Sequence, residues 1–271
     1  MRLAFSTLSC PAWTWDQTIE NAVRWGYDGL EWRLVDGQII GREFPRDRAA
    51  EIGRASADAG LTVLALDSSI DLAAQPGPER DRVLAETRTM LDTAGRFGAE
   101  FLRVFPGAFP PAAGAATWLR ETIELLRRDC RDAGVRIALE LHDSRDQPGI
   151  RGISCSRFLA EALEGTDIPE VRVQWDIGNP HLEGEPAAET WANIGRWLSY
   201  LHLKDMVRTT GGWRYTPMGE GELPLRDILR WIGGRQFDGW SSFEWEKYWH
   251  PELAEPEVVL PGFVAYMSEY R

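Results

Sequence analysis

The sequence predicts an α/β fold in which eight parallel strands and their helices form a closed (β/α)8 barrel, with residues 1–271 in a single domain. The main observation is alternation, because eight apolar strand patterns are separated by helical patterns without a linker or low-complexity tract. The loop after the first strand also contains no glycine. An open doubly wound sheet normally has a glycine-rich phosphate loop there, so the closed barrel is favoured.

In the first half of the chain, strands are short apolar runs and helices are segments with apolar residues at helical spacing. Glycine follows the helical patterns at Gly26, Gly60 and Gly98, as is typical of a helix C-terminus. The expected strands cover residues 3–7, 27–33, 61–67 and 101–105. The expected helices cover residues 15–25, 45–59 and 76–97.

The second half contains VRIALELH, a continuous apolar and β-branched run that is typical of a fully buried parallel strand. Gly134 ends the helix before it, and Ser154 is the expected N-cap of the helix after it. The expected strands cover residues 135–142, 171–176, 200–205 and 239–246. The expected helices cover residues 117–133, 154–163, 186–197, 223–232 and 256–270.

Composition limits the class of partner. A formal net charge of −12 and a pI near 4.9 argue against a nucleic-acid partner, which requires a local surplus of Lys and Arg. The three cysteines are scattered without a CxxC motif, which favours reduced thiols in a cytoplasmic protein. No apolar run resembles a signal peptide or a membrane span. We therefore expect a cytoplasmic protein with no membrane partner. A homodimer and a homotetramer are both compatible with the sequence, which does not determine the oligomeric state.

Four polar residues lie at the ends of the last four expected strands: Glu140, Asp176, His202 and Glu244. In a (β/α)8 barrel these ends meet at one mouth, where active sites form. Carboxylate oxygens with one imidazole and no thiolate suit a single Mn²⁺, Mg²⁺ or Co²⁺ ion, and Zn²⁺ is also compatible. The joint occurrence of the four residues predicts a divalent metal site.

Each of these residues also has a simpler interpretation. Glu140 could be a buried ion-pair partner of Arg103, since buried charges must be paired or coordinated. Asp176 precedes IGNP and could cap a strand-to-turn junction. His202 lies between two leucines and could be a core histidine. One of Glu244 and Glu246 could be a solvated strand end. Each alternative explains one residue, but chance is a poor explanation for all four residues lying at one mouth of the barrel.

The chain resembles the xylose-isomerase-like TIM barrel superfamily of sugar-phosphate isomerases and epimerases, which also includes dehydratases and apurinic-site endonucleases. The resemblance spans most of the chain, in the order YDGLEWR, LELHD, WDIGNPHLEGE, LHLKD, MGEGELPLRDIL and FDGWSSFEWE. It implies that Glu140, Asp176, His202 and Glu244 are the metal ligands. It also implies that Glu140 and Glu244 form an acid/base pair working from opposite faces of a sugar.

The same resemblance implies that His142, Arg103 and Lys204 contact the substrate, with Glu31 a further match of this kind. One position departs from the family pattern. Members often have a histidine three residues after the strand-six aspartate, where this chain has Asn179, and His181 follows two residues later. The sequence leaves open whether His181 takes over that contact.

The expected reaction is isomerisation or epimerisation of a sugar or sugar phosphate, by proton transfer next to a carbonyl through an enediolate. A divalent cation would stabilise the enediolate oxygens, and the two glutamates would move the proton. One alternative is a dehydratase acting on inosose or a dehydroshikimate-like acid. Less favoured are a DNA-repair endonuclease, which would need more metal ligands than four histidines allow, and a sugar-binding barrel without catalysis.

Aromatic and cationic residues near the strand ends suggest further contacts. Trp13 or Trp15 is expected to form a wall against the apolar face of a sugar, although tryptophan also fills barrel-helix packing. The glycine-rich segment 209–222 is either a lid that excludes water or an ordinary long loop. The sequence has no phosphate-loop pattern, but four cationic residues could bind a phosphate on the substrate: Arg33, Arg103, Lys204 and Arg208.

Overall fold

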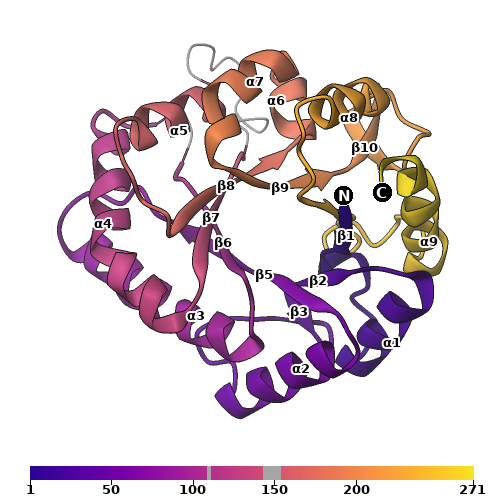
Figure 1. Cartoon of the computed structure of the whole chain (residues 1–271), viewed down its shortest axis with the longest axis horizontal. Helices are drawn as coiled ribbons and strands as arrows, with labels where there is room; N and C mark the ends of the chain where they lie inside the picture. The colour runs from indigo at the N-terminus through magenta and orange to yellow at the C-terminus, as the bar shows by residue number, and fades with distance from the viewer. Residues whose placement is uncertain (109–110, 143–153) are drawn as a thin grey trace.

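The computed structural model describes residues 1–108, 111–142 and 154–271 and confirms the predicted barrel. Eight strands form one sheet in the order β1-β12-β9-β8-β7-β6-β5-β2, and each of its ladders is parallel. Figure 1 shows the strands at the centre and helices around them. The barrel strands are β1 (Arg2–Phe5), β2 (Gly29–Trp32), β5 (Thr62–Asp71), β6 (Phe101–Phe105), β7 (Arg136–Glu140), β8 (Val171–Asp176), β9 (Leu198–Leu203) and β12 (Trp240–Phe243).

The two ends of the sheet, β1 and β2, meet and nearly close the cylinder. Ser6 and Glu31 form a single parallel bridge between them. The backbone N–H of Asp28 donates to the carbonyl of Leu3 at 2.8 Å, and the Asp28 carboxylate accepts from the N–H of Leu3 at 2.8 Å. The Asp28 carboxylate thus adds a hydrogen bond to the contact between β1 and β2, where strand pairing is limited to a single bridge.

Most outer helices begin and end within two residues of the predicted limits; α7 and α9 end earlier and continue as 3-10 turns, and the short α6 was not predicted. The glycines after α1, α3 and α4 adopt the left-handed conformation, and the Ser154 hydroxyl accepts from the N–H of Arg157 at the start of α5. The helices are α1 (Trp15–Trp25), α2 (Arg46–Asp58), α3 (Pro78–Phe97), α4 (Ala115–Ala133), α5 (Cys155–Leu163), α6 (Gly178–Leu182), α7 (Ala187–Ile194), α8 (Leu225–Gly233) and α9 (Pro256–Met267), with short 3-10 turns at η1 (Thr7–Ser9), η2 (Gly195–Trp197) and η3 (Ser268–Tyr270).

The amino-terminal end of the barrel interior is filled by a plug of large and small side chains. This plug is a buried cluster that combines alanines with Phe101, Tyr200 and Trp240, and the Phe101 and Tyr200 rings lie 5.5 Å apart. Arg136 lies over Phe101 and Arg2 over Trp240, so cationic side chains cover this plug. The plug closes the amino end of the barrel below His202, whose ring lies 5.8 Å from that of Tyr200.

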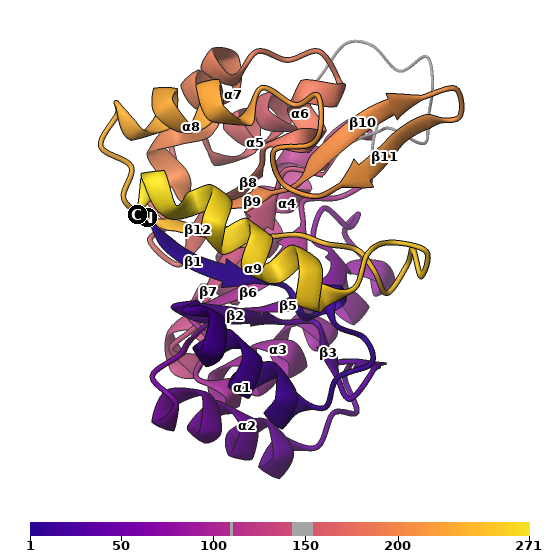
Figure 2. The same cartoon turned by 90° about the vertical axis from the view of Figure 1, so that its right-hand side faces the viewer.

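Two antiparallel hairpins were not predicted. The first consists of β3 (Leu34–Val35) and β4 (Gln38–Ile39), and the second of β10 (Asp205–Thr209) and β11 (Gly212–Thr216). The second hairpin includes residues 209–216 of the glycine-rich segment 209–222. This part therefore forms strand and turn instead of an irregular loop. The Asp205 carboxylate fixes the chain after β11 by accepting hydrogen bonds from the backbone N–H groups of Gly219 and Gly221, each at 2.9 Å. Figure 2 shows this hairpin projecting from the barrel.

Within residues 1–108, 111–142 and 154–271, no helix is both long enough and apolar enough to cross a membrane.

Candidate metal centre and active site

The four predicted ligand residues lie on strands that are neighbours in the barrel. Glu140 ends β7, Asp176 ends β8, His202 is in β9, and Glu244 directly follows β12. Asp176 is in register with His202, and His202 with Ser242, two residues before Glu244. Side chains two residues apart share a face of a strand, so this register directs them to one side. One ligand atom from each lies within 4.8 Å of the others.

All four side chains are buried, and three of their atoms lack normal hydrogen bonds within the described ranges. These atoms are Glu140 Oε2, Asp176 Oδ2 and His202 Nδ1. Each atom has a charged neighbour instead, namely Arg103 Nε at 3.1 Å, Lys204 Nζ at 2.6 Å and Glu244 Oε1 at 3.4 Å, respectively. A cation would satisfy the lone pairs that remain on these buried atoms. Three carboxylates and one imidazole are the donor set that suits Mn²⁺, Mg²⁺ or Co²⁺, and zinc also accepts it. The residues therefore fit a divalent cation.

The charge balance around the cluster agrees with this fit. Among the described residues, the cluster and its surroundings contain five buried carboxylates and three buried Arg or Lys cations. In the metal-free protein burial opposes protonation of His202, but Glu31 and Glu244 raise its pKa well above the usual range. When His202 is neutral, as metal ligation requires, negative charge exceeds positive charge by two, which a divalent cation would neutralise. The carboxylates are Glu31, Asp67, Glu140, Asp176 and Glu244, and the cations are Arg33, Arg103 and Lys204.

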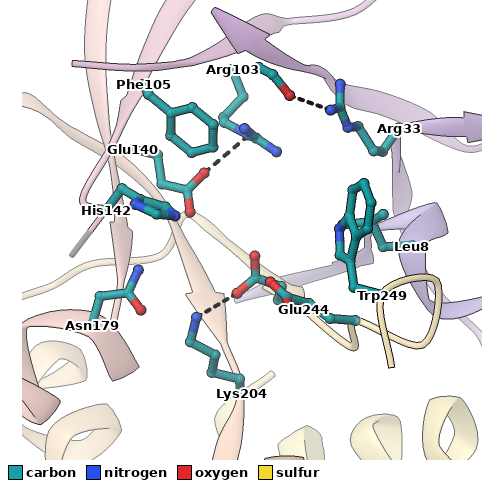
Figure 3. Close-up of a pocket in the computed structure, with 12 residues that line it drawn as sticks. Leu8, Arg33, Arg103, Phe105, Glu140, His142, Asn179, Lys204, Glu244 and Trp249 are labelled. Atoms are coloured by element: carbon teal, nitrogen blue, oxygen red, sulfur yellow. Dashed lines mark hydrogen bonds and ion pairs between the residues drawn. The ribbon is translucent and has the colours of Figure 1, made fainter. Parts of the chain in front are cut away.

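Ion pairs hold the carboxylates in place. Arg103 Nε lies 3.1 Å from Glu140 Oε2 and 3.7 Å from Asp67 Oδ1. Lys204 Nζ lies 2.6 Å from Asp176 Oδ2 and 2.9 Å from Glu244 Oε2. The pairing of Glu140 with Arg103 that the sequence offered as an alternative to ligation is thus present. It coexists with the ligand cluster, because the second carboxylate oxygen and the open side of Glu140 remain directed to the pocket (Figure 3).

Glu31, which the resemblance implied as a substrate contact, does not line the described pocket. It is completely buried behind the cluster, where its two oxygens lie 2.9 and 3.1 Å from His202 Nε2. A metal-binding histidine usually donates its second ring N–H to a carboxylate, which fixes the ring orientation. Glu31 in this position directs His202 Nδ1 to the ligand cluster, so it is a positioning residue.

Replacing Glu31 with glutamine is expected to weaken metal binding about 10–100-fold, because an amide holds the His202 ring less firmly and lowers its basicity. Titration of the metal-free variant with Mn²⁺, followed by calorimetry, measures this change. Replacement of the exposed Glu20 by glutamine provides the matched control. Unchanged Mn²⁺ affinity in the Glu31 variant would contradict the positioning role.

Burial changes the protonation of the cluster in the metal-free protein. It raises the pKa of Glu140 to about 8 against the attraction of Arg103. It also raises the pKa of Asp67 to about 7, with a contribution from Glu31, and that of Asp176 to about 6 against the attraction of Lys204. For Glu244, burial opposes ionisation, yet Lys204 and His202 together hold its pKa well below the usual range.

The raised pKa values predict a pH-dependent stability. Between about pH 4 and 8 the folded metal-free protein binds more protons than the unfolded chain, so its free energy of unfolding should fall as pH rises. A divalent cation competes with these protons for the carboxylates, so the stabilisation it gives should grow over the same range. Melting temperatures of chelator-treated and Mn²⁺-loaded protein from pH 5 to about 8 test both trends. A metal-free melting temperature that rises across this range would contradict the assignment.

A pocket of about 220 Å³ opens over the cluster. This volume is below the usual range for drug-sized ligands and suits a small polar molecule. Arg103, His142 and Lys204, which the resemblance implied as substrate contacts, line it together with the carboxylates of Glu140 and Glu244 (Figure 3). The last residue of the LELHD motif, at position 143, lies outside the described ranges.

Neither of the tryptophans expected to form a sugar wall, Trp13 and Trp15, lines the described pocket. Trp13 packs on Trp25 with ring centroids 5.7 Å apart and donates from Nε1 to Glu257, while Trp15 begins α1. Both are partly buried against the hydrophobic core. The aromatic lining is instead Phe105, at the end of β6, and Trp249, which is 52% exposed in the loop after β12.

The structure also distinguishes Asn179 from His181. Asn179 lines the pocket, where its backbone N–H donates to Asp176 Oδ1 at 2.9 Å and its Nδ2 donates to the carbonyl of Leu141 at 2.9 Å. His181 lies one step further along α6 and does not line the described pocket. The residue that lines the described pocket at this point is thus Asn179, and a substrate contact by His181 stays a prediction.

Comparisons with known proteins agree with the fold. An 83-residue stretch is 32% identical to fructoselysine 3-epimerase from Shigella flexneri, covering 31% of this chain and 29% of that protein. The chain thus matches less than a third of that relative's length. The crystal structure of the IOLI protein with a binding zinc atom has a TM-score of 0.76 at 17% identity, covering 100% of this chain and 99% of that chain.

The same fold also occurs in a protein whose description names a different reaction. A probable 3-DHS dehydratase from Bacillus anthracis has a TM-score of 0.71 at 15% identity, covering 100% of this chain and 98% of that chain. At these identities the likeness concerns the fold. Residues 19–260 match the family described as Xylose isomerase-like TIM barrel. With its parallel barrel and the match over most of its length, the chain belongs to the xylose isomerase-like TIM barrel family.

Proposed function

We propose that this protein is a divalent-metal-dependent sugar epimerase or isomerase that transfers a proton on the carbon next to a carbonyl. The observation that supports this most directly is the placement of two carboxylates, Glu140 and Glu244, around one ligand cluster in a small pocket. The local sequence similarity to a sugar 3-epimerase supports the same reaction class. The substrate would be a sugar or sugar phosphate of about monosaccharide size.

The neighbours of the two glutamates suit opposite roles in proton transfer. In the metal-free protein, burial favours the protonated form of Glu140, whereas Lys204 and His202 keep Glu244 ionised. Such a difference between two carboxyl groups is what an acid/base pair requires. When bound, a divalent cation would stabilise the negative charge that develops on the substrate oxygens as the proton leaves. Glu244 would accept the proton on one side, and Glu140 would deliver a proton on the other.

Other lining residues would orient the substrate and limit water. Arg103 holds Glu140, and Lys204 can donate to a substrate hydroxyl from its position between Asp176 and Glu244. Phe105 packs edge-on against His142, with ring centroids 4.7 Å apart. Phe105 and Trp249 offer apolar surfaces to the carbon face of a sugar, a common use of aromatic rings.

Deuterium exchange tests the proposal. Protein loaded with Mn²⁺ is incubated in deuterated water with a panel of ketoses and inosose, and each sugar is examined by mass spectrometry and NMR. Incorporation of deuterium at the carbon next to the carbonyl, with formation of an epimer or isomer, is the expected result. Absence of both turnover and exchange across the panel would reject the proposed function.

The same experiment separates the dehydratase alternative. Elimination would begin with the same proton removal but would release a hydroxyl group and form an unsaturated ketone, which absorbs strongly in the ultraviolet. Growth of that absorbance with inosose or a dehydroshikimate-like acid would favour elimination. An endonuclease is less favoured because the described residues contain one group of potential metal ligands, and that group holds a single histidine.

A further inference from the structure

The three buried cations of the pocket differ in their partners. Arg103 and Lys204 are each paired with two carboxylates, as described above. Arg33 is only 6% exposed, yet it forms no ion pair with a carboxylate among the described residues. Burying a charge is costly unless it is paired, so a guanidinium of this kind facing a pocket indicates an anionic ligand.

Two neutral acceptors hold the Arg33 guanidinium in place. One terminal nitrogen donates to the carbonyl of Asp67 at 3.0 Å, and the other donates to the Ser69 hydroxyl at 2.5 Å. The backbone is fixed as well, because the N–H of Arg33 donates to Thr7 Oγ1 at 2.9 Å. A guanidinium has five N–H donors, so these bonds leave donors for a ligand. Burial and the nearby Arg103 lower the pKa of Arg33 to about 10, at which it remains charged at neutral pH.

The position of Arg33 defines which end of a substrate it would contact. Figure 3 shows Arg33 with Leu8 and Trp249 on one side of the pocket, and Lys204, Asn179 and His142 on the other. Ser69 also lines this part of the pocket. A substrate whose reacting carbon lies between Glu140 and Glu244 would therefore extend its far end toward Arg33.

We propose that Arg33 and Ser69 form an anion subsite that selects substrates carrying a carboxylate or a phosphate at the end away from the reacting carbon. Arginine suits this role because its planar donors can bind either group through two parallel hydrogen bonds. This inference uses the proposed function only to place the reacting carbon. Anion binding itself depends on the Arg33 geometry and is measured without turnover.

Three matched ketoses test the subsite: D-fructose, D-fructuronate and D-fructose 6-phosphate. They differ mainly at the sixth carbon, so their reacting ends are comparable. Calorimetry with Mn²⁺-loaded protein is expected to show that at least one anionic sugar binds roughly tenfold or more tightly than D-fructose. Comparison of the two anions identifies the preferred group. Equal affinity for all three sugars would overturn the proposal.

The variant Arg33→Gln should abolish the preference for the anionic sugar and leave D-fructose affinity nearly unchanged. The matched control is Arg235→Gln, which removes the same charge from an exposed position at the C-terminal end of α8 and should preserve the preference. A preference that survives Arg33→Gln would arise from the metal or Lys204 and would overturn the subsite.

Two further measurements keep the test decisive. If Arg33→Gln does not fold, Arg33→Lys replaces it, because lysine keeps the charge but lacks the planar pair of donors. The anion preference should then fall several-fold, and an unchanged preference would contradict the assignment. Deuterium exchange on the same sugars separates the two proposals: Arg33-dependent anion binding without exchange would reject the epimerase function and retain the subsite.

Discussion

Replacing Glu140 with glutamine is expected to lower the rate of deuterium exchange into the substrate by about 10²–10⁴-fold, the usual contribution of a general acid or base. Glutamine keeps the shape of the side chain and one oxygen ligand but cannot carry the transferred proton. The metal-free fold should tolerate it, because burial raises the pKa of Glu140 to about 8 and the neutral acid resembles an amide. Exchange rates at saturating Mn²⁺ and sugar measure the loss.

A loss of deuterium exchange in the Glu140 variant must be distinguished from a loss of metal binding. Calorimetric titrations with Mn²⁺ and with the sugar should show that the Glu140 variant still binds both. Glu100→Gln is the matched control, since Glu100 lies just before β6 at the opposite end of the barrel and pairs with Arg136. A variant that binds metal and sugar normally and exchanges at the wild-type rate would remove Glu140 from the acid/base pair.

The sequence was sufficient to predict the barrel because its signals are local. Apolar runs, helical spacing and glycine C-caps act within about ten residues, and helix α1 and strand β6 have the predicted limits. The clustering of Glu140, Asp176, His202 and Glu244 followed from one geometric rule, that parallel strand ends meet. The short hairpins were missed because two-residue strands and polar turns have no period to detect.

Side-chain direction was harder to predict. Glu31 and Arg33 are two residues apart near the end of β2, but Glu31 is buried behind His202 and Arg33 faces the pocket. Arg33 lies just beyond the end of β2, where its backbone N–H donates to Thr7 Oγ1, so strand alternation no longer sets its direction. Trp13 and Trp249 show the same limit, since both are near strand ends and only the loop path determines which one reaches the pocket. Asp67 was recognised only as a strand end.

Loss of the Lys204 ammonium should strongly destabilise the metal-free protein. This ammonium is 2% exposed and contacts Asp176 and Glu244, so Lys204→Met would leave two buried carboxylates facing each other without their cation. Removing one partner of a buried charge pair typically costs about 3–5 kcal/mol. The free energy of unfolding in urea, measured with a chelator present, should fall by about this amount.

Saturation with Mn²⁺ should recover much of that loss, because a divalent cation neutralises the carboxylates that Lys204 no longer neutralises. The chain offers a matched control in its other lysine, Lys247, which is also buried but donates to the carbonyls of Pro251 and Leu253, away from the ligand cluster. Lys247→Met should destabilise the protein equally with and without metal. If Lys204→Met behaves in the same way, the lysine and the proposed cation do not share the charge of Asp176 and Glu244, and the metal assignment fails at its electrostatic basis.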